Sequence, residues 1–185
     1  MQALIDRDKF FGRVRVMSFG GALHQGQVDG CNAILDAWEA RPAFTDLRWL
    51  AYMLATAKWE TAHTMKPIEE IGKGRGRPYG VPTQDGRIFY GRGYVQLTWA
   101  TNYAKMAALT GADLVGHPEL ALEPKIAALI LFEGMKGGLF TGVGLPRYFG
   151  DTADDPVNAR RIINGTDHAD DIAAIHHAFL AGLQP

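Results

Sequence analysis

A glycine- and proline-rich stretch near the middle of the chain interrupts an otherwise helical pattern. Residues 72–87 contain five glycines and two prolines, a composition that disfavours long helices and regular strands. Within this stretch, 84–87 is typical of a turn, and the run 88–90 beside it is expected to be a short strand. The interruption therefore predicts a small irregular lobe with a β element, set into a mainly helical domain.

Helical spacing of apolar residues accounts for most of the remaining chain. A third helix is expected to begin at Thr45 or Asp46, either of which can cap it. This helix carries Glu60 in its last turns, and Pro67 should end it near Thr64. No repeat or interdomain linker is visible, so we expect the whole chain to form one domain. The other helices are expected at about 7–17, 25–40, 99–110, 124–136, 156–163 and 168–182.

Composition and charge disfavour several classes of protein. The 185 residues, 47% hydrophobic and 21% charged, are ordinary for a globular domain with its own core. A net charge of −1 argues against a nucleic-acid-binding protein that neutralises phosphates. No apolar run reaches the length of about 18 residues that indicates a membrane span, so no stable membrane insertion is expected. Residues 1–15 lack the apolar core and cleavage site of a signal peptide, which predicts synthesis in the cytoplasm.

Two kinds of catalytic site are also disfavoured. Cys31 is the single cysteine, and its helical spacing from Val28 and Ile34 indicates a core residue and not a nucleophilic thiol. The six histidines show no His-Glu-Xaa-Xaa-His spacing, so a zinc site of the kind found in cell-wall amidases is not expected. We therefore expect no metal and no cofactor.

Glu60 stands at the end of the third helix, in the sequence Trp-Glu-Thr-Ala-His-Thr at 59–64. The negative end of the helix dipole and the apolar ring of Trp59 both favour the protonated carboxyl group. A carboxylic acid that stays protonated near neutral pH can protonate the leaving oxygen of a sugar bond. The alternative is a solvated surface glutamate, which is the usual state of this residue.

A second carboxylate for such chemistry has to come from Glu69 or Glu70, which stand between two isoleucines. Neighbouring side chains of an extended segment point to opposite faces, so only one of the two can face a cleft. Because the isoleucines flank the pair symmetrically, the apolar pattern does not select between them.

The segment 89–99 adds polar groups suited to sugars. Gln96 and Thr98 should share a face by alternation, and a threonine hydroxyl near a base carboxylate can hold an attacking water. Gln96 and Asn102 supply amides that can bind sugar hydroxyls and N-acetyl groups. Aromatic rings that can stack on sugars, or can equally pack in the core, are those of Tyr90, Tyr94 and Trp99.

Three motifs in order resemble one enzyme family. These are Trp-Glu-Thr at 59–61, Tyr-Gly-Arg-Gly-Tyr-Val-Gln-Leu-Thr-Trp-Ala-Thr-Asn-Tyr at 90–103, and Ile-Ile-Asn-Gly at 162–165. They are similar to the acid motif, the signature segment and a late motif of glycoside hydrolase family 19, which holds plant-type chitinases and many phage endolysins. The similarity runs from about Trp49 to Leu183. It implies a lysozyme-like α+β fold, in which the cleft lies between a helical body and a small β element.

The resemblance also implies roles for individual residues. Glu60 would be the general acid, and Thr98 would hold the attacking water. Similarity to phage-type members indicates Glu70 over Glu69 as the base. The implied mechanism inverts the sugar carbon, which requires carboxyl groups roughly 6.5–9.5 Å apart. The implied glycan-binding residues are Gln96, Asn102 and Asn164, with the ring of Tyr90 as a further candidate.

The chain departs from the family pattern next to the acid. Trp59 replaces the family's histidine, and 62–64 replace its paired glycines, which weakens the case for a chitin substrate. The leading interpretation is therefore a monomeric phage endolysin without a separate wall-binding module. It would cut the bond between N-acetylmuramic acid and N-acetylglucosamine in peptidoglycan, after release through a membrane pore. The alternatives are a chitinase and a non-catalytic glycan-binding module. The basic segment 73–77 is interpreted either as attracting anionic wall or outer-membrane polymers or as a solvated loop.

Overall fold

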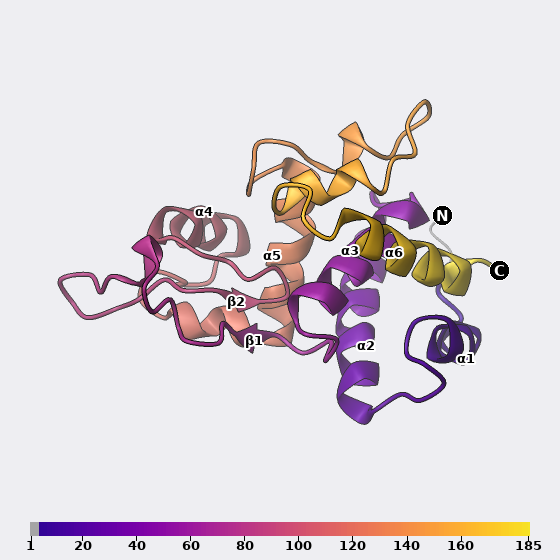
Figure 1. Cartoon of the computed structure of the whole chain (residues 1–185), viewed down its shortest axis with the longest axis horizontal. Helices are drawn as coiled ribbons and strands as arrows, with labels where there is room; N and C mark the ends of the chain where they lie inside the picture. The colour runs from indigo at the N-terminus through magenta and orange to yellow at the C-terminus, as the bar shows by residue number, and fades with distance from the viewer. Residues whose placement is uncertain (1–3) are drawn as a thin grey trace.

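The computed structural model describes residues 4–185 as a helical body with a small irregular lobe on one side (Figure 1). Within these residues, no helix combines the length and the apolar content needed to cross a bilayer. The mainly helical fold with a small β element is confirmed. The α-helices are α1 (Arg7–Met17), α2 (Gln25–Glu39), α3 (Leu47–Glu60), α4 (Ala100–Thr110), α5 (Pro124–Gly137) and α6 (Ala169–Leu183). The 3-10 helices are η1 (Pro78–Gly80), η2 (Pro118–Leu122), η3 (Leu145–Arg147) and η4 (Asn158–Ile162).

Helix α3 passes through the body and is buried on all sides. Residues 50–57 are all buried, which fits a helix that is apolar around its whole circumference. Helix α6 packs along α3 and α1, and Phe179 of α6 stacks on Phe10 of α1 with ring centroids 6.2 Å apart. Trp38 of α2 packs against Phe132 of α5 at 6.3 Å. The helix that carries Glu60 is therefore held rigidly in the core.

Helix α3 ends at Glu60, short of the expected end near Thr64. The side chain of Thr61, the C-cap residue, accepts a hydrogen bond from the Met65 amide at 3.0 Å, which closes a tight turn. Gly30 of α2 lets this turn approach, because a Cβ at Gly30 would lie 1.7 Å from the Met65 carbonyl oxygen. The early end leaves Glu60 at the C-terminus of the helix.

The lobe contains a two-stranded antiparallel sheet made of β1 (Ile68–Glu69) and β2 (Arg92–Gly93). Ile68 lies opposite Gly93, and Glu69 lies opposite Arg92. The pairing continues beyond the sheet, because the Glu70 amide donates a hydrogen bond to the Gly91 carbonyl oxygen at 2.7 Å. The sheet thus places Glu69 and Glu70 on opposite faces of the lobe wall. One of these faces is turned toward the helical body.

The turn expected at 84–87 is present, and the Gly86 amide donates to the Thr83 carbonyl oxygen at 2.9 Å. The strand expected at 88–90 is wrong. Its Phe89 carbonyl oxygen accepts a hydrogen bond from the Trp99 amide at 2.9 Å, outside the sheet. The sequence suggested a strand because the run is apolar and aromatic, and in the structure the rings of Phe89 and Tyr90 are buried. Apolar residues alone do not distinguish a short strand from a buried loop.

The helix expected at 156–163 is the shorter 3-10 helix η4. Its start is fixed by Asp155, whose Oδ1 accepts a hydrogen bond from the Asn158 amide at 3.0 Å. Its end bonds in the tighter i to i+3 manner, with the Ile163 amide donating to the Arg160 carbonyl oxygen at 3.1 Å. This geometry turns the Arg160 side chain into the protein, where it is buried.

His176 of α6 gives the fold a testable pH dependence. Neither ring nitrogen has a hydrogen-bond partner among residues 4–185, and burial, followed by the charges of His177 and Arg48, lowers the pKa of His176 to about 4. An unfolded histidine titrates near 6.5, so the unfolded chain binds a proton that the folded chain excludes. Stability should therefore fall as the pH drops from about 6.5 to about 4, by about 3 kcal/mol at the lower end.

Denaturant unfolding at several pH values checks this expectation. The variant His176→Leu removes the titrating ring and should lose less stability between neutral and acid pH than the parent. Glu69, whose pKa is lowered by hydrogen bonds from Tyr90 and Lys73, contributes the same acid sensitivity to both proteins and cancels in the comparison. An unchanged difference between the two pH values in His176→Leu would show that the ring does not titrate in this way.

Candidate active site

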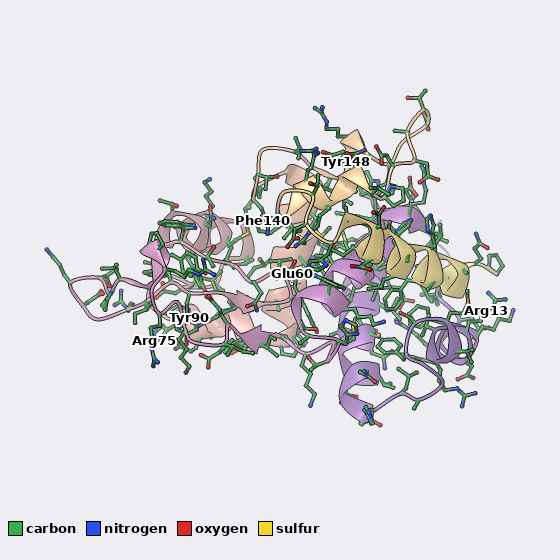
Figure 2. All side chains as sticks on the ribbon, viewed as in Figure 1. Arg13, Glu60, Arg75, Tyr90, Phe140 and Tyr148 are labelled. Carbon is green, nitrogen blue, oxygen red and sulfur yellow. The ribbon has the colours of Figure 1, made fainter. Side chains whose placement is uncertain are left out.

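A cleft between the helical body and the lobe brings together side chains that are far apart in the sequence. Its volume is ≈ 410 Å³. Glu60 reaches it from the end of α3, and Glu70 reaches it from the lobe, directly after β1. Figure 2 shows Glu60 at the junction of the two parts. The other lining residues are Tyr79, Gly91, Val95, Gln96, Thr98, Ile163 and Asn164.

Glu60 is held by an ion pair. Its Oε1 accepts a hydrogen bond from Nη1 of Arg160 at 2.6 Å. Arg160 is buried, and its Nε donates to the Asp167 carbonyl oxygen at 3.0 Å, so the guanidinium is itself fixed. The carboxyl group that was expected to be a neutral acid thus lies beside a guanidinium that no motif indicated. Among residues 4–185, no hydrogen bond holds Oε2 of Glu60, and this oxygen is available to a ligand.

Glu70 is held by two donors from the lobe. Its Oε1 accepts a hydrogen bond from the Tyr79 hydroxyl at 2.9 Å, and its Oε2 accepts one from the Gly91 amide at 3.0 Å. The cleft thus holds two carboxyl groups with different partners: a guanidinium for Glu60, and a phenol with a backbone amide for Glu70.

Glu69 lies outside this cleft. Hydrogen bonds from the Tyr90 hydroxyl and from Lys73 lower the pKa of Glu69, with a smaller contribution from the charge of Arg92. The alternation expected for 68–71 is therefore present, and the structure brings Glu70 and not Glu69 to Glu60. This placement selects between the two residues that the apolar pattern left open.

Thr98 and Gln96 both line the cleft, as alternation predicted. The Gln96 amide nitrogen donates to the Ile68 carbonyl oxygen at 3.1 Å and lies 3.3 Å from that of Gly93, which ties the side chain to the sheet. With its nitrogen engaged, the amide of Gln96 presents its oxygen to the cleft side. Thr98 makes no side-chain hydrogen bond among residues 4–185, so its hydroxyl is available to water or sugar.

A second hollow of ≈ 210 Å³ continues the cleft and shares Gln96 and Thr98 with it. Asn102, in the first turn of α4, lines this extension together with the exposed ring of Trp99. Asn164 lines the main cleft, and its Oδ1 accepts a hydrogen bond from the Gly165 amide at 2.9 Å. The amide residues expected from the sequence are therefore spread along one continuous groove.

Tyr90 is not part of this groove. Its ring is buried against the guanidinium of Arg92 at 3.6 Å, and its hydroxyl donates to Glu69. The expectation that Tyr90 contacts a glycan is not supported by this position. The groove contains the ring of Tyr79 instead, which packs edge-on against Trp99 with ring centroids 5.6 Å apart.

Sequence reasoning missed two residues of the cleft. Tyr79 lies in the irregular stretch 72–87, where no periodic pattern shows which side chains point inward. Arg160 is adjacent to Arg161, and nothing in the sequence shows that only the first is buried. The one available signal was the position of Arg160, which stands four residues before Asn164 and just ahead of the late Ile-Ile-Asn-Gly motif.

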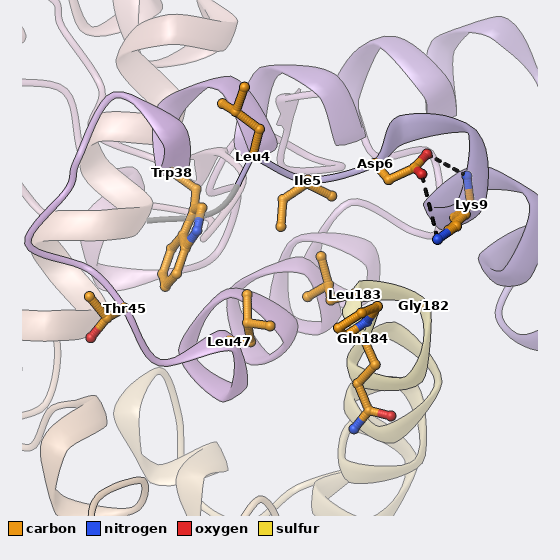
Figure 3. A pocket seen from close by; sticks show the side chains of 11 residues that line it. Leu4, Ile5, Asp6, Lys9, Trp38, Thr45, Leu47, Gly182, Leu183 and Gln184 are labelled. Carbon is orange, nitrogen blue, oxygen red and sulfur yellow. Dashed lines mark hydrogen bonds and ion pairs between the residues drawn. The ribbon is translucent and has the colours of Figure 1, made fainter. Parts of the chain in front are cut away.

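Another hollow, of ≈ 370 Å³, lies near the two ends of the chain (Figure 3). It is lined mostly by apolar residues, among them Trp38, Leu47 and Leu183. Among residues 4–185, Asp6 is the one acid that lines it, and this side chain caps α1 by accepting a hydrogen bond from the Lys9 amide at 3.1 Å. Because it lacks a pair of carboxyl groups, this hollow is no candidate for acid–base chemistry.

Residues 72–133 match the family model described as class I chitinase of glycoside hydrolase family 19. The resemblance to glycoside hydrolase family 19 is confirmed. The matched range includes Tyr79 and the signature segment 90–103, whereas Glu60 and Glu70 lie before it. Over this range the chain is similar to glycoside hydrolases of family 19, and its mainly helical architecture is the lysozyme-like one that the motifs implied.

Solved structures extend the family 19 likeness to nearly the whole chain. Chitinase C from Streptomyces griseus HUT6037 is 20% identical, with a TM-score of 0.60, over 95% of this chain and 74% of that one. A bacterial family 19 chitinase is also 20% identical, with a TM-score of 0.56, over 98% of this chain and 95% of that one. At this identity the likeness shows the fold alone. A comparison with curated proteins found no significant match.

Proposed function

We propose that this family 19 glycoside hydrolase cleaves β-1,4 bonds of an N-acetylated glycan by a single inverting displacement. Glu60 donates a proton to the leaving glycosidic oxygen while water attacks the sugar carbon from the opposite side. Glu70 takes a proton from that water, and the Thr98 hydroxyl orients it. The bond to the leaving sugar breaks as the bond to water forms, so the products are two sugars with one new reducing end.

One observation carries this proposal: Glu60 and Glu70 line the same cleft from different parts of the fold. The unpaired Oε2 of Glu60 suits a proton donor to a ligand. Glu70 accepts two hydrogen bonds from the lobe, which fix its carboxyl group in the wall of the cleft. The separate partners give the two carboxyl groups different roles, which is what acid–base catalysis requires.

For the substrate, we propose the strand of peptidoglycan, cut between N-acetylmuramic acid and N-acetylglucosamine. Support comes from the departures next to the acid, where the ring of Trp59 packs at a tilt against the rings of His168 and His63, with centroids 4.8 and 6.0 Å apart. These aromatic rings make the surroundings of Glu60 differ from the family pattern. We further propose that the protein acts as a monomeric endolysin, reaching the wall through a membrane pore.

Chitin is the second candidate substrate, because the similar solved structures are named chitinases. Parallel digests of purified peptidoglycan and colloidal chitin, run in heavy-oxygen water, distinguish the two. Mass spectrometry should find the heavy oxygen at a new reducing end of muramic acid in the peptidoglycan digest. Label in chitin products alone would establish a chitinase instead, and new free amines would indicate a peptidase or amidase.

Thr98→Ala should slow hydrolysis by about tenfold, less than the loss of either carboxyl group, because solvent can partly order the attacking water. Turnover on the preferred glycan is the measurement, with Thr98→Ser as the matched control that keeps the hydroxyl. Near-parent turnover in Thr98→Ser and a deficit in Thr98→Ala would support the water-holding role. An equal deficit in both would point to packing.

A further inference from the structure

Charge is divided unevenly between the lobe and the body. Residues 66–105 hold seven lysines and arginines against three acidic residues, whereas the rest of the chain holds 12 against 17. The net charge of −1 for the whole chain hides this division. A cluster of cations on one part of a surface attracts anionic ligands even where the protein as a whole is neutral.

Three of these seven cations are engaged. Lys73 pairs with Glu69 at 2.9 Å, Arg87 pairs with its neighbour Asp85 at 2.6 Å, and Arg92 is buried in the lobe. Arg75 and Arg77 differ from these. Both are exposed, and their side chains make no ion pair or hydrogen bond within residues 4–185 (Figure 2 labels Arg75 at the edge of the lobe).

The loop beneath these two arginines has a defined shape. The amides of Arg75 and Arg77 donate to the carbonyl oxygens of Gly72 and Gly74 at 3.0 and 2.9 Å, in successive turns. Gly74 packs directly against Gly80, where an added Cβ would lie 1.8 Å from the Gly74 carbonyl oxygen. Because the backbone is ordered in the free protein, ligand binding does not have to order it.

The same loop leads into the wall of the cleft. The Arg77 carbonyl oxygen accepts a hydrogen bond from the Gly80 amide at 2.9 Å and so closes η1. Tyr79 within η1 donates to Glu70 at 2.9 Å. Arg77 therefore stands two positions from a residue that lines the cleft.

The cleft itself offers no free cation to a substrate. Its lining side chains are neutral or acidic, and Arg160 behind them is engaged by Glu60 and the Asp167 carbonyl oxygen. A peptidoglycan strand carries a carboxyl group on every muramic acid, either as the free lactyl group or on the attached peptide. The Glu70 carboxylate in the cleft would repel these carboxylates unless a nearby cation offsets the repulsion.

We propose that Arg75 and Arg77 form a cationic rim at the Tyr79 end of the cleft, which binds carboxylates carried by the peptidoglycan strand. This inference rests on the proposed peptidoglycan activity and names the part of that substrate the rim takes. The rim acts on binding and leaves the chemical step to the cleft. It also gives the enzyme a preference for this anionic glycan over neutral chitin.

Kinetics of the double variant Arg75→Gln/Arg77→Gln test the proposal. At low ionic strength, KM for purified peptidoglycan should rise about five- to tenfold, the size expected for two exposed charge pairs, while kcat stays within about twofold. KM for chitin oligosaccharides should not change. In about 1 M salt, where the screening length is about 3 Å, parent and variant should converge.

Two matched variants accompany this measurement. Arg15→Gln/Arg147→Gln removes the same charge from exposed arginines far from the lobe and should leave KM unchanged. Arg75→Lys/Arg77→Lys keeps the charge and should restore most of the affinity. Peptidoglycan stripped of its peptides by an amidase keeps the lactyl carboxylate: a persisting effect identifies the lactyl group as ligand, and an effect confined to intact material identifies the peptide.

Several results would overturn the rim. These are an unchanged KM in the glutamine variant, an equal rise on chitin, or an equal rise in the Arg15/Arg147 control. A defect seen with lipopolysaccharide vesicles but not with purified peptidoglycan would assign the arginines to membrane phosphates instead. If the parent does not cleave peptidoglycan, the proposed function fails by itself. Co-sedimentation of Glu60→Gln with peptidoglycan, with and without the arginine substitutions, then decides whether the rim binds that polymer.

Discussion

Replacing Glu60 with glutamine is expected to lower the rate of glycan hydrolysis by about 10²–10⁴-fold, the usual contribution of a general acid. The amide oxygen of glutamine can still accept the hydrogen bond from Arg160, so the buried guanidinium keeps a partner. The amide cannot deliver a proton to a leaving oxygen. Turnover on the preferred glycan, together with thermal unfolding to verify the fold, measures the effect.

A substrate with an acidic leaving group provides the control for Glu60. A dinitrophenyl glycoside needs little protonation when its bond breaks, so Glu60→Gln should lose much less activity on it than on the natural glycan. Equal losses on both substrates would mean that the residue supports the fold or binding. If Glu60→Gln lyses permeabilised cells as fast as the parent, Glu60 is not the acid.

Glu70→Gln is expected to lower the rate by a similar factor of about 10²–10⁴, because no other group in the cleft is placed to take the proton from water. An amide retains an oxygen that can accept from Tyr79 or Gly91, so the lobe should keep its shape. Initial rates on the natural glycan, at the pH optimum of the parent, are the measurement.

Glu69→Gln is the matched control for Glu70, since it makes the same chemical change one residue away on the reverse of the lobe wall. Its partners are Tyr90, Lys73 and Arg92, outside the cleft, so the rate should change by no more than a few fold. If Glu69→Gln is the damaging change and Glu70→Gln is mild, the base assignment has to be exchanged.

Much of the fold was predictable because helices are specified by sequence signals within a few residues. The capping side chain of Asp46, the apolar spacing of α3 and the glycine after α4 are short-range signals, and these elements lie close to where they were expected. The misses at 88–90 and 156–163 have a common cause. In both, hydrogen bonds from other segments hold the backbone: the Trp99 amide donates to the Phe89 carbonyl oxygen, and the Thr141 hydroxyl donates to the carbonyl oxygens of Arg161 and Ile162.

The candidate site divides in the same way. Glu60, Gln96 and Thr98 were singled out from their motifs, and all of them line the cleft. Tyr90 carries the same kind of local signal but is buried beneath Arg92, because a motif does not specify which way a ring points. Tyr79 belongs to none of the motifs, and it is part of the site because its hydroxyl donates a hydrogen bond to Glu70.

The sequence by itself determined the mainly helical body, the irregular lobe and the acid at the end of a helix. The tertiary structure placed Glu70 and not Glu69 in the cleft, and only it revealed Arg160 as the partner of Glu60. The physical reason is range. Helix spacing and caps depend on residues within a few positions, whereas Glu60 and Arg160 meet across 100 positions, through packing that no local pattern records.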